Sequence, residues 1–342
     1  MLRFTWLILL GVTGNVLSQL PNRIAFGSCG HQDKPLEIFN TIDKTAPDLF
    51  IFLGDNIYGD TENMRVLRKK YKQLKQNPNF SQLKNHTRIL ATWDDHDYGA
   101  NDAGKYYPQK ARSKKIFLKF FDEPRRSERK KHEGIYTSYF FRDSSQILQL
   151  ILLDCRTFRN NLLRYDGSLS QDTTHSYTLD YSPHPENSDS TLIGEEQWQW
   201  LKGELKKPAT LRIICSSTQF ATEYNGYEAW ANFPGEQRRM FELIKETKAN
   251  GVMFISGDVH YAELSVREYP GLYPIYDLTS SGLTEEWKFA TPNVHRVGAP
   301  VMENHFGLIE LDWIEKKITL DIRNSNNAIQ LSHSLLIQEL KF

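Results

Sequence analysis

The chain lacks an excess of charge of either sign, which limits the partners it is expected to have. Its 342 residues include 42 Lys plus Arg and 42 Asp plus Glu, so the formal net charge is zero. A balanced chain offers no broad positive surface for nucleic acid or for an anionic membrane. We therefore expect no nucleic-acid-binding surface, and we expect the protein to be a monomer.

Cysteine is scarce, with only three residues in the whole chain: Cys29, Cys155 and Cys215. At most one disulfide can form, so the fold does not depend on a disulfide framework, and at least one thiol is left for another use. Cys155 and Cys215 lie in apolar, strand-like runs, and we expect both to be buried core thiols. Cys29 instead directly follows the strand-like run at 23–28.

Long apolar runs are missing beyond the N-terminus. Arg3 is the only charged residue among residues 1–21, and an apolar run follows it over 4–12. That run is too short for a membrane span, and small residues precede Ser18. We interpret 1–18 as a secretory signal peptide that is cleaved after Ser18, with an uncleaved anchor as the alternative. The expected location is secreted, periplasmic or on the cell surface, with no transmembrane segment in the mature chain.

Neither an internal repeat nor a low-complexity linker divides the chain, so residues 19–342 are predicted to form a single domain. Short apolar runs typical of buried strands occur at 23–28, 48–53, 88–93, 146–154, 211–217 and 252–257. Helical patterns lie between them at 35–45, 62–76, 107–121, 195–206 and 236–248. This alternation predicts an α/β fold with a largely parallel sheet. Near the C-terminus, 306–312 and 317–323 alternate like an antiparallel pair, with a further strand expected near 333–339.

Two insertions interrupt this pattern. Residues 122–133 are strongly charged, and residues 164–194 are polar with scattered Ser and Asp. A run of charges is usually a solvated loop, and we interpret 122–133 in that way. Either insertion is long enough to overhang a cleft.

Chemically active side chains follow five of the predicted strands. Because ligands of α/β sheets gather beyond the carboxyl ends of parallel strands, these side chains are expected at one edge. They are Cys29; Asp55 and Tyr58; Asp94, Asp95, His96 and Asp97; Asp154 and Arg156; and Asp258 and His260.

Each of these residues alone has an ordinary structural interpretation. A Gly-Asp pair after a strand is commonly a turn, and an aspartate such as Asp94 or Asp258 commonly caps a helix. A lone Cys29 is more often a small core residue. Together, however, four adjacent acidic or imidazole groups at 94–97 repel one another unless a cation is present. The combination therefore favours a metal site.

The residue types indicate which metals would bind. Thiolate and imidazole suit iron or zinc, and a phenolate suits ferric iron, so a trivalent ion is expected near Cys29 and Tyr58. Divalent ions are expected near the carboxylates, with Asp55 as the ligand shared between ions about 3.5–4 Å apart. Such a pair lowers the pKa of a bound water. His96 is then the expected proton donor to a leaving alkoxide, and Arg156 either contacts phosphate or forms a structural salt bridge.

Seven motifs in order along the chain resemble those of the alkaline phosphatase D family, which has the calcineurin-like metallophosphatase fold. They are GSC (27–29), PDLFIFLGDNIYGD (47–60), TWDDHDYGANDAGK (92–105), LLDCRTFR (152–159), GEEQWQWL (194–201), ISGDVH (255–260) and YDLTSSGL (276–283). The resemblance implies a four-layer α/β/β/α sandwich of two mixed sheets. It also implies hydrolysis of phosphate mono- or diesters, with Fe³⁺ and Ca²⁺ as cofactors and other divalent metals as possibilities.

Matching these motifs residue by residue implies a set of site residues. The implied metal ligands are Cys29, Asp55, Tyr58, Asp95, Asp258 and His260. His96 would sit over the leaving group, Arg156 would contact the phosphate, and Asn101 would face the substrate. Close relatives often carry a basic residue where this chain has Val259, which leaves substrate specificity open.

Two other functions remain open at this stage. The aromatic-rich region around Trp287 is compatible with a phospholipase D-like hydrolase of phospholipid head groups. A non-catalytic, metal-stabilised binding protein would show metal content without turnover.

Overall fold

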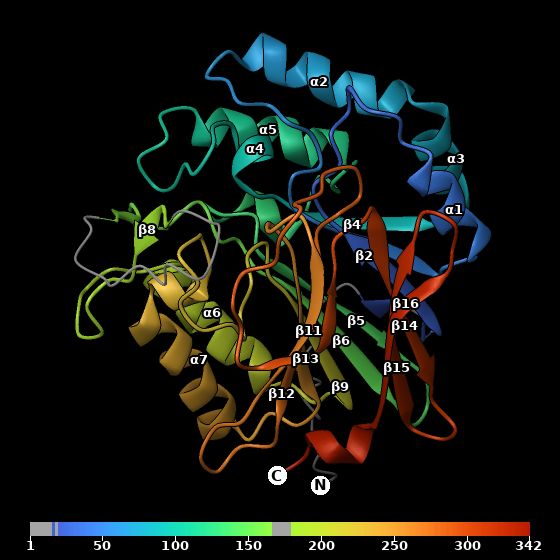
Figure 1. Cartoon of the computed structure of the whole chain (residues 1–342), viewed down its shortest axis with the longest axis vertical. Helices are drawn as coiled ribbons and strands as arrows, with labels where there is room; N and C mark the ends of the chain where they lie inside the picture. The colour runs from blue at the N-terminus through green and yellow to red at the C-terminus, as the bar shows by residue number, and fades with distance from the viewer. Residues whose placement is uncertain (1–15, 18–19, 166–178) are drawn as a thin grey trace, which may run out of the picture.

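The computed structural model describes residues 16–17, 20–165 and 179–342, which form two large mixed β-sheets with helices on their outer faces (Figure 1). Most of the predicted signal peptide, 1–18, lies outside the described residues. The helices are α1 (Ile38–Lys44), α2 (Met64–Gln76), α3 (Pro78–His86), α4 (Asp95–Tyr98), α5 (Lys110–Phe120), α6 (Gly194–Leu205) and α7 (Pro234–Thr247), with short 3₁₀ turns at Glu128–Lys130, Trp230–Asn232 and Ile337–Leu340.

One sheet has six strands in the order β16-β15-β14-β2-β3-β4. They are β2 (Arg23–Gly27), β3 (Leu49–Leu53), β4 (Arg88–Thr92), β14 (His305–Asp312), β15 (Lys317–Asn324) and β16 (Ile329–Leu336). β2, β3 and β4 are mutually parallel, whereas β14, β15 and β16 pair antiparallel. The carboxyl ends of β2, β3 and β4 therefore meet at one edge.

The other sheet has eight strands in the order β1-β5-β6-β9-β10-β12-β11-β13. They are β1 (Val16–Leu17), β5 (Thr137–Arg142), β6 (Ile147–Leu152), β9 (Leu211–Cys215), β10 (Val252–Ser256), β11 (Ala262–Arg267), β12 (Ile275–Ser280) and β13 (Arg296–Val301). β6, β9, β10 and β12 run parallel, so their carboxyl ends also share an edge. A separate two-stranded ribbon pairs β7 (Leu163–Arg164) with β8 (Tyr181–Ser182).

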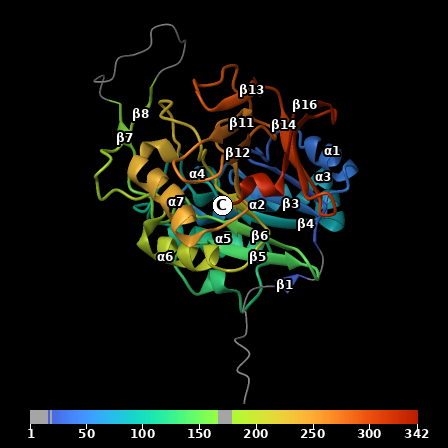
Figure 2. The same ribbon diagram turned by 90° about the horizontal axis from the view of Figure 1, so that it is seen from below.

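The alternation of side chains along the parallel strands produces the layers. In β3, Ile51 faces the eight-stranded sheet, while Phe50 and Phe52 face the opposite way and contact Phe39 of α1. On the far face of the eight-stranded sheet, Trp198 of α6 belongs to the buried core. Figure 2 shows α6 and α7 at one side, α1 and α3 at the other, and the strands between them. The predicted four-layer α/β/β/α sandwich is confirmed.

The predicted strands before residue 260 and the antiparallel pair near the C-terminus are all present, with ends within a few residues of their predicted positions. α3 was not predicted, although Asn77 caps it by accepting from the backbone N–H groups of Asn79 and Phe80 and Pro78 stands at its first turn. Residues 122–133 are not simply a solvated loop, because Arg129 within them is 1% exposed. Its guanidinium donates to the carbonyls of Ala91 and Ile135 and pairs with Glu123, which offsets the cost of its burial.

All three cysteines are buried and free, as expected for Cys155 and Cys215, which lie in the core between the layers. Among the described residues, we find no helix with the length and apolar character that a membrane crossing requires.

Candidate active site

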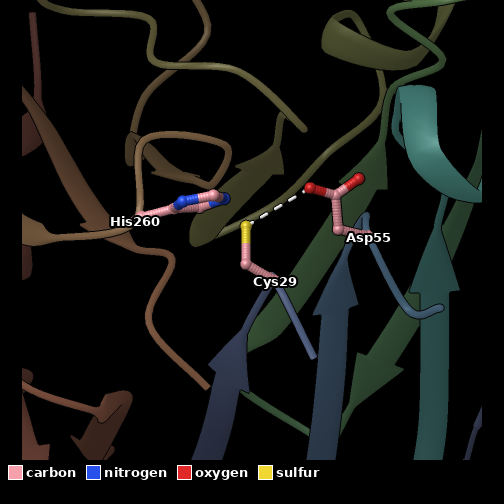
Figure 3. Close-up of side chains that lie close together, drawn as sticks. All are labelled: Cys29, Asp55 and His260. Atoms are coloured by element: carbon pink, nitrogen blue, oxygen red, sulfur yellow. Dashed lines mark hydrogen bonds between the residues drawn. The ribbon is translucent and has the colours of Figure 1, made fainter. Parts of the chain in front are cut away.

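The residues that follow the parallel strands converge where the edges of the two sheets meet. The backbone N–H of Ser28, after β2, donates to the carbonyl of Ser280 at the end of β12 (3.1 Å), which joins the sheets at this edge. Cys29 follows at once. In Figure 3, Cys29 lies between Asp55, which follows β3, and His260, which comes from the other sheet. Chain topology alone therefore brings these three side chains together, as predicted.

The donor atoms fall into three overlapping groups, each with its atoms within 4.8 Å of one another. Asp55 is common to the first two groups, and Asp95 is common to the last two. The groups are Cys29, Asp55 and His260; Asp55, Asp95 and His96; and Asp94, Asp95 and Asp258. Asp94 was one of the four residues at 94–97 that favoured a metal site, with a helix cap as its alternative, but it was not among the implied metal ligands, so its place in a donor group adds to that set.

The first group is tightly packed around the Cys29 thiol. Its Sγ lies 3.3 Å from Asp55 Oδ2 and 3.7 Å from the carbonyl of Asp258. Tyr58 joins the same group, because its hydroxyl lies 3.2 Å from His260 Nε2. Burial lowers the pKa of His260 to about 4, so its imidazole is neutral near neutral pH and keeps a lone pair for a ligand.

Several buried carboxylate oxygens in these groups have no hydrogen-bond partner: Asp55 Oδ1, Asp94 Oδ2 and Asp95 Oδ1. Burial, reinforced by Asp95 and Asp94, raises the pKa of Asp55 well above its usual range, although His96 opposes the shift. Buried carboxylate oxygens that lack a hydrogen-bond partner are unfavourable unless a cation lies beside them. The residues present therefore fit metal ions, with thiolate, phenol and imidazole at one end of the cluster and carboxylates at the other.

The backbone at this edge is held in an uncommon conformation. The φ angles of Cys29 (61°), Asp55 (49°), Asp258 (83°) and His260 (53°) are all positive. Residues with a Cβ rarely adopt this region, and such strain concentrates at functional sites. These positive φ angles could not be predicted from the sequence pattern.

The glycines of the two Gly-Asp pairs allow chain segments to approach closely. At Gly54, with φ 111°, an added Cβ would lie 2.4 Å from Cβ of Asp94. At Gly257, an added Cβ would lie 2.5 Å from Oγ of Ser28. Each glycine thus brings one strand end against the next, which sets the spacing of the donor groups.

His96 lies beside the carboxylates and is partly open to solvent. Its Nδ1 lies 2.7 Å from Asp60 Oδ1, and its ring packs on Tyr58 with centroids 4.1 Å apart. Burial lowers the pKa of His96, but Asp55 and Asp95 outweigh burial and raise the pKa to about 10. The imidazole therefore holds its second proton and is charged near neutral pH.

Asp97, by contrast, turns away from the donor groups. Its carboxylate accepts hydrogen bonds from the backbone of Asp94 (2.7 Å) and from the hydroxyl of Tyr71 (3.2 Å), and it also binds the Asn56 amide. The four neighbours at 94–97 therefore have different roles, and this carboxylate serves to hold the start of α4.

Arg156 is fully buried behind the donor groups. Its Nε donates to Asp94 Oδ1, and its Nη1 donates to both oxygens of Glu228 at 2.8 and 2.7 Å. Nη2 has no hydrogen-bond partner and lies 3.8 Å from Asp95 Oδ1. Glu228 also pairs with Arg159 at 3.0 Å. Sequence reasoning missed Glu228, because it stands in no motif and about 70 residues separate it from Arg156.

Asn101 and its neighbour Asp102 lie on the loop after α4. Asn101 is exposed, and its amide donates to Asp102 Oδ2 (2.8 Å). The backbone N–H of Asp102 donates to Asp95 Oδ2 (2.7 Å), and its carboxylate binds the hydroxyl of Tyr181. The second insertion thus reaches the site through Tyr181, although its residues 166–178 lie outside the described part of the chain. Val259 is fully buried, so its side chain does not face solvent.

Comparisons with known proteins show the family and the fold of this chain. The family model described as PhoD-like phosphatase matches residues 24–333. Alkaline phosphatase D of Bacillus subtilis (strain 168) is 23% identical over 274 residues, which are 69% of this chain and 45% of that protein. This chain thus spans about half the length of that relative.

Solved structures show the same fold at lower identity. A structure described as that of PhoD superimposes with a TM-score of 0.70 at 16% identity, covering 94% of this chain and 71% of the other. GAP50, described as the anchor in the inner membrane complex of Plasmodium, superimposes with a TM-score of 0.58 at 14% identity, covering 92% of this chain and 89% of the other. The extent of the family match, which takes in both sheets and all three donor groups, identifies the chain as a member of the PhoD-like phosphatase family.

Proposed function

We propose that this protein is an exported, metal-dependent hydrolase of phosphoric esters that acts on phosphate diesters or monoesters. The observation that carries the proposal is the row of three overlapping donor groups with unpartnered buried carboxylate oxygens. Membership in the PhoD-like phosphatase family supports the same reaction class.

In this proposal, different donor residues bind the trivalent and the divalent metal ions. Cys29, Tyr58 and His260 would hold a ferric ion, and Asp55 would be the carboxylate shared with the neighbouring ion. The carboxylates of Asp94, Asp95 and Asp258 would hold calcium or another divalent ion. When bound, the metal ions supply positive charge to the phosphoryl group and lower the pKa of a water molecule.

The remaining roles fall to side chains around the metal ligands. His96, oriented by Asp60, donates a proton to the oxygen of the leaving alkoxide. We assign Arg156 to position Asp94, because its guanidinium is fully buried and engaged with Asp94 and Glu228. Among its nitrogens, Nη2 has no hydrogen-bond partner and would be the atom through which Arg156 contacts phosphate. Asn101, exposed on the loop after α4, is the proposed contact at the mouth of the site.

The reaction is tested with the purified protein and two chromogenic esters, p-nitrophenyl phosphate and bis-p-nitrophenyl phosphate. We expect hydrolysis of at least one ester, its loss on chelation, and its loss in Asp55→Asn, which removes the shared carboxylate. Metal-replete protein that is inactive on both esters and on phospholipid and nucleotide substrates would overturn the proposal. Metal content without any turnover would instead favour a metal-stabilised binding protein.

The ferric assignment has its own readout. A tyrosinate bound to ferric iron absorbs visible light, so we expect a coloured protein whose band disappears in Tyr58→Phe. A colourless, iron-free protein with full activity would contradict the assignment of iron while leaving the reaction class intact.

Export and oligomeric state are further parts of the proposal. Cleavage after Ser18 is checked by determining the N-terminus of the protein recovered from the medium or periplasm of its host. Recovery only in the cytoplasm, with Met1 retained, would contradict export. Sedimentation of the purified protein is expected to give the mass of one chain.

A further inference from the structure

Three aromatic side chains form a half-buried cluster beside the candidate active site: Tyr227, Trp287 and Phe289, here called the aromatic wall. The rings of Trp287 and Phe289 are stacked, with centroids 5.1 Å apart and planes at 16°. Tyr227 packs against Trp287 at 4.9 Å and lies 6.2 Å from Phe289. The three rings come from two chain segments, one before Trp230 and one between β12 and β13.

Both segments are tied directly to the site. The backbone N–H of Trp287 donates to the carbonyl of His260 (3.0 Å), and the two rings meet edge to face at 5.5 Å. Tyr227 immediately precedes Glu228, whose carboxylate binds Arg156. The aromatic wall therefore begins at a proposed metal ligand and continues outward from it.

The exposure of these rings distinguishes them from the structural tryptophans. Trp93, Trp198 and Trp230 are at most 1% exposed, and the indole N–H of each donates to a buried partner. Tyr227, Trp287 and Phe289 retain solvent exposure although they lie in contact with one another. Clustered aromatic side chains that are only half-buried beside a polar site are typical of ligand-binding surfaces.

We propose that the aromatic wall binds a nucleobase on the side of the ester that is retained, while the phosphate lies at the proposed metal ligands. This inference rests on the proposed phosphoesterase function. A flat ring gains dispersion and quadrupole attraction by stacking on one exposed ring face. An acyl chain needs to be enclosed on several sides to gain comparable free energy, so the wall favours a planar group over the tail of a phospholipid.

Two diesters with the same leaving group test the proposal: the p-nitrophenyl ester of thymidine monophosphate and methyl p-nitrophenyl phosphate. The chemical step releases the same phenolate from both, so their ratio of kcat/KM reports binding of the retained group. Stacking of one base predicts a preference of about 5- to 100-fold for the thymidine ester. Trp287→Ala is expected to remove most of that preference, whereas Trp287→Phe, which keeps a ring, retains part of it.

The matched control is Phe342→Ala, which removes an exposed ring far from the site. Phe342 packs on Tyr273, whose hydroxyl accepts from the backbone N–H of Val252 at the amino end of β10, whereas Asp258 follows the carboxyl end. The control is expected to leave the ratio unchanged. A second readout is inhibition by adenosine monophosphate compared with ribose phosphate, which differ only in the base. We expect tighter inhibition by the nucleotide in the wild type and equal inhibition in Trp287→Ala.

The outcomes separate the two proposals. Hydrolysis of both diesters at similar kcat/KM, or a preference that survives Trp287→Ala and Tyr227→Ala, overturns the role of the aromatic wall and leaves the phosphoesterase function standing. A higher kcat/KM for a short-chain phosphatidylcholine than for the thymidine ester overturns it in favour of a lipid substrate. Failure to hydrolyse any of these esters overturns the function itself.

Discussion

Single residues at the candidate site act mostly through close approach and charge balance. Asp94 illustrates both. One carboxylate oxygen accepts from Arg156 and from the hydroxyl of Ser217, while the other is left without a hydrogen bond. The hydrogen bonds to Oδ1 fix the orientation of the carboxylate and therefore the position of Oδ2. A carboxylate proposed to bind metal is thus held by the buried guanidinium of Arg156 on its opposite side.

Gly54→Ala adds only one methyl group, but we expect it to disrupt the site strongly. The added Cβ would lie 2.4 Å from Asp94 Cβ and 2.8 Å from its backbone N, and the positive φ adds strain. We expect a loss of about 2–4 kcal/mol in unfolding free energy, together with a lower metal content. The matched control is Gly203→Ala in α6, where nothing lies within 4 Å of the added Cβ. Gly203→Ala should stabilise the helix by about 0.5–1 kcal/mol. Equal effects in chemical denaturation would contradict the close-approach role.

Glu228→Gln tests the charge network behind the donor groups. It leaves two buried guanidinium groups, Arg156 and Arg159, without the carboxylate that pairs with both. Removing one partner of a buried ion pair typically costs about 3–5 kcal/mol, and Asp94 also loses the support of a fixed Arg156. We expect lower thermal stability and lower kcat together. Glu223→Gln, an exposed position in the same segment that pairs with His295, serves as the control. Unchanged kcat and stability in Glu228→Gln would show that the network is dispensable.

Among the elements, β12 and β14 are connected by hydrogen bonds that fix the backbone of His260 at the edge of the sheets. His305, the first residue of β14, accepts at Nε2 from the backbone N–H of Ser281, just after β12. The Ser281 hydroxyl in turn accepts from the backbone N–H of His260 (2.6 Å). Gly282 makes room for the imidazole, because an added Cβ there would lie 2.2 Å from His305 Cε1. A buried histidine thus connects the six-stranded sheet to a proposed ligand on the other.

His305 predicts a pH dependence of stability. Burial lowers its pKa to about 4, and its Nε2 must stay unprotonated to accept from Ser281. The unfolded chain therefore binds the proton first, and the stabilising effect of neutral His305 is present above about pH 6.5 and lost as the pH falls toward about 4. The contribution is of the order of 3 kcal/mol over that interval. His305→Gln should be less stable than the wild type at about pH 7.5 but lose less stability on acidification. Parallel acid-unfolding profiles for the two proteins would contradict this assignment.

The whole molecule places the carboxyl ends of two parallel strand sets against each other. β2, β3 and β4 of one sheet and β6, β9 and β10 of the other all end at the same edge, joined there by the bond from Ser28 to Ser280. This arrangement explains why the strand pattern was enough to predict which side chains lie close together. Once the strands were recognised, their direction alone predicted that Cys29, Asp55 and His260 would meet.

Other features could not be predicted from the sequence, for identifiable physical reasons. Asp94 and Asp97 are chemically identical, and only the three-dimensional course of α4 turns one toward the donor groups and the other toward Tyr71. In the sequence, Glu228 and Arg129 resemble ordinary surface charges, and only the folded structure shows that both are buried. The positive φ angles at the ligands likewise arise from tertiary packing rather than from any local preference.

The central claim is that the hydrolysis of phosphoric esters requires metal ions held by the proposed ligands, which are Cys29, Asp55, Tyr58, Asp94, Asp95, Asp258 and His260. Its most direct test is metal analysis of the purified wild type and of Asp55→Asn, combined with hydrolysis of bis-p-nitrophenyl phosphate by the same samples. We predict bound metal, including iron, and activity in the wild type, both lost in parallel in the variant and on chelation, with activity restored when metal is returned. A metal-free, folded wild type that hydrolyses the ester as fast as the metal-replete protein would contradict the claim.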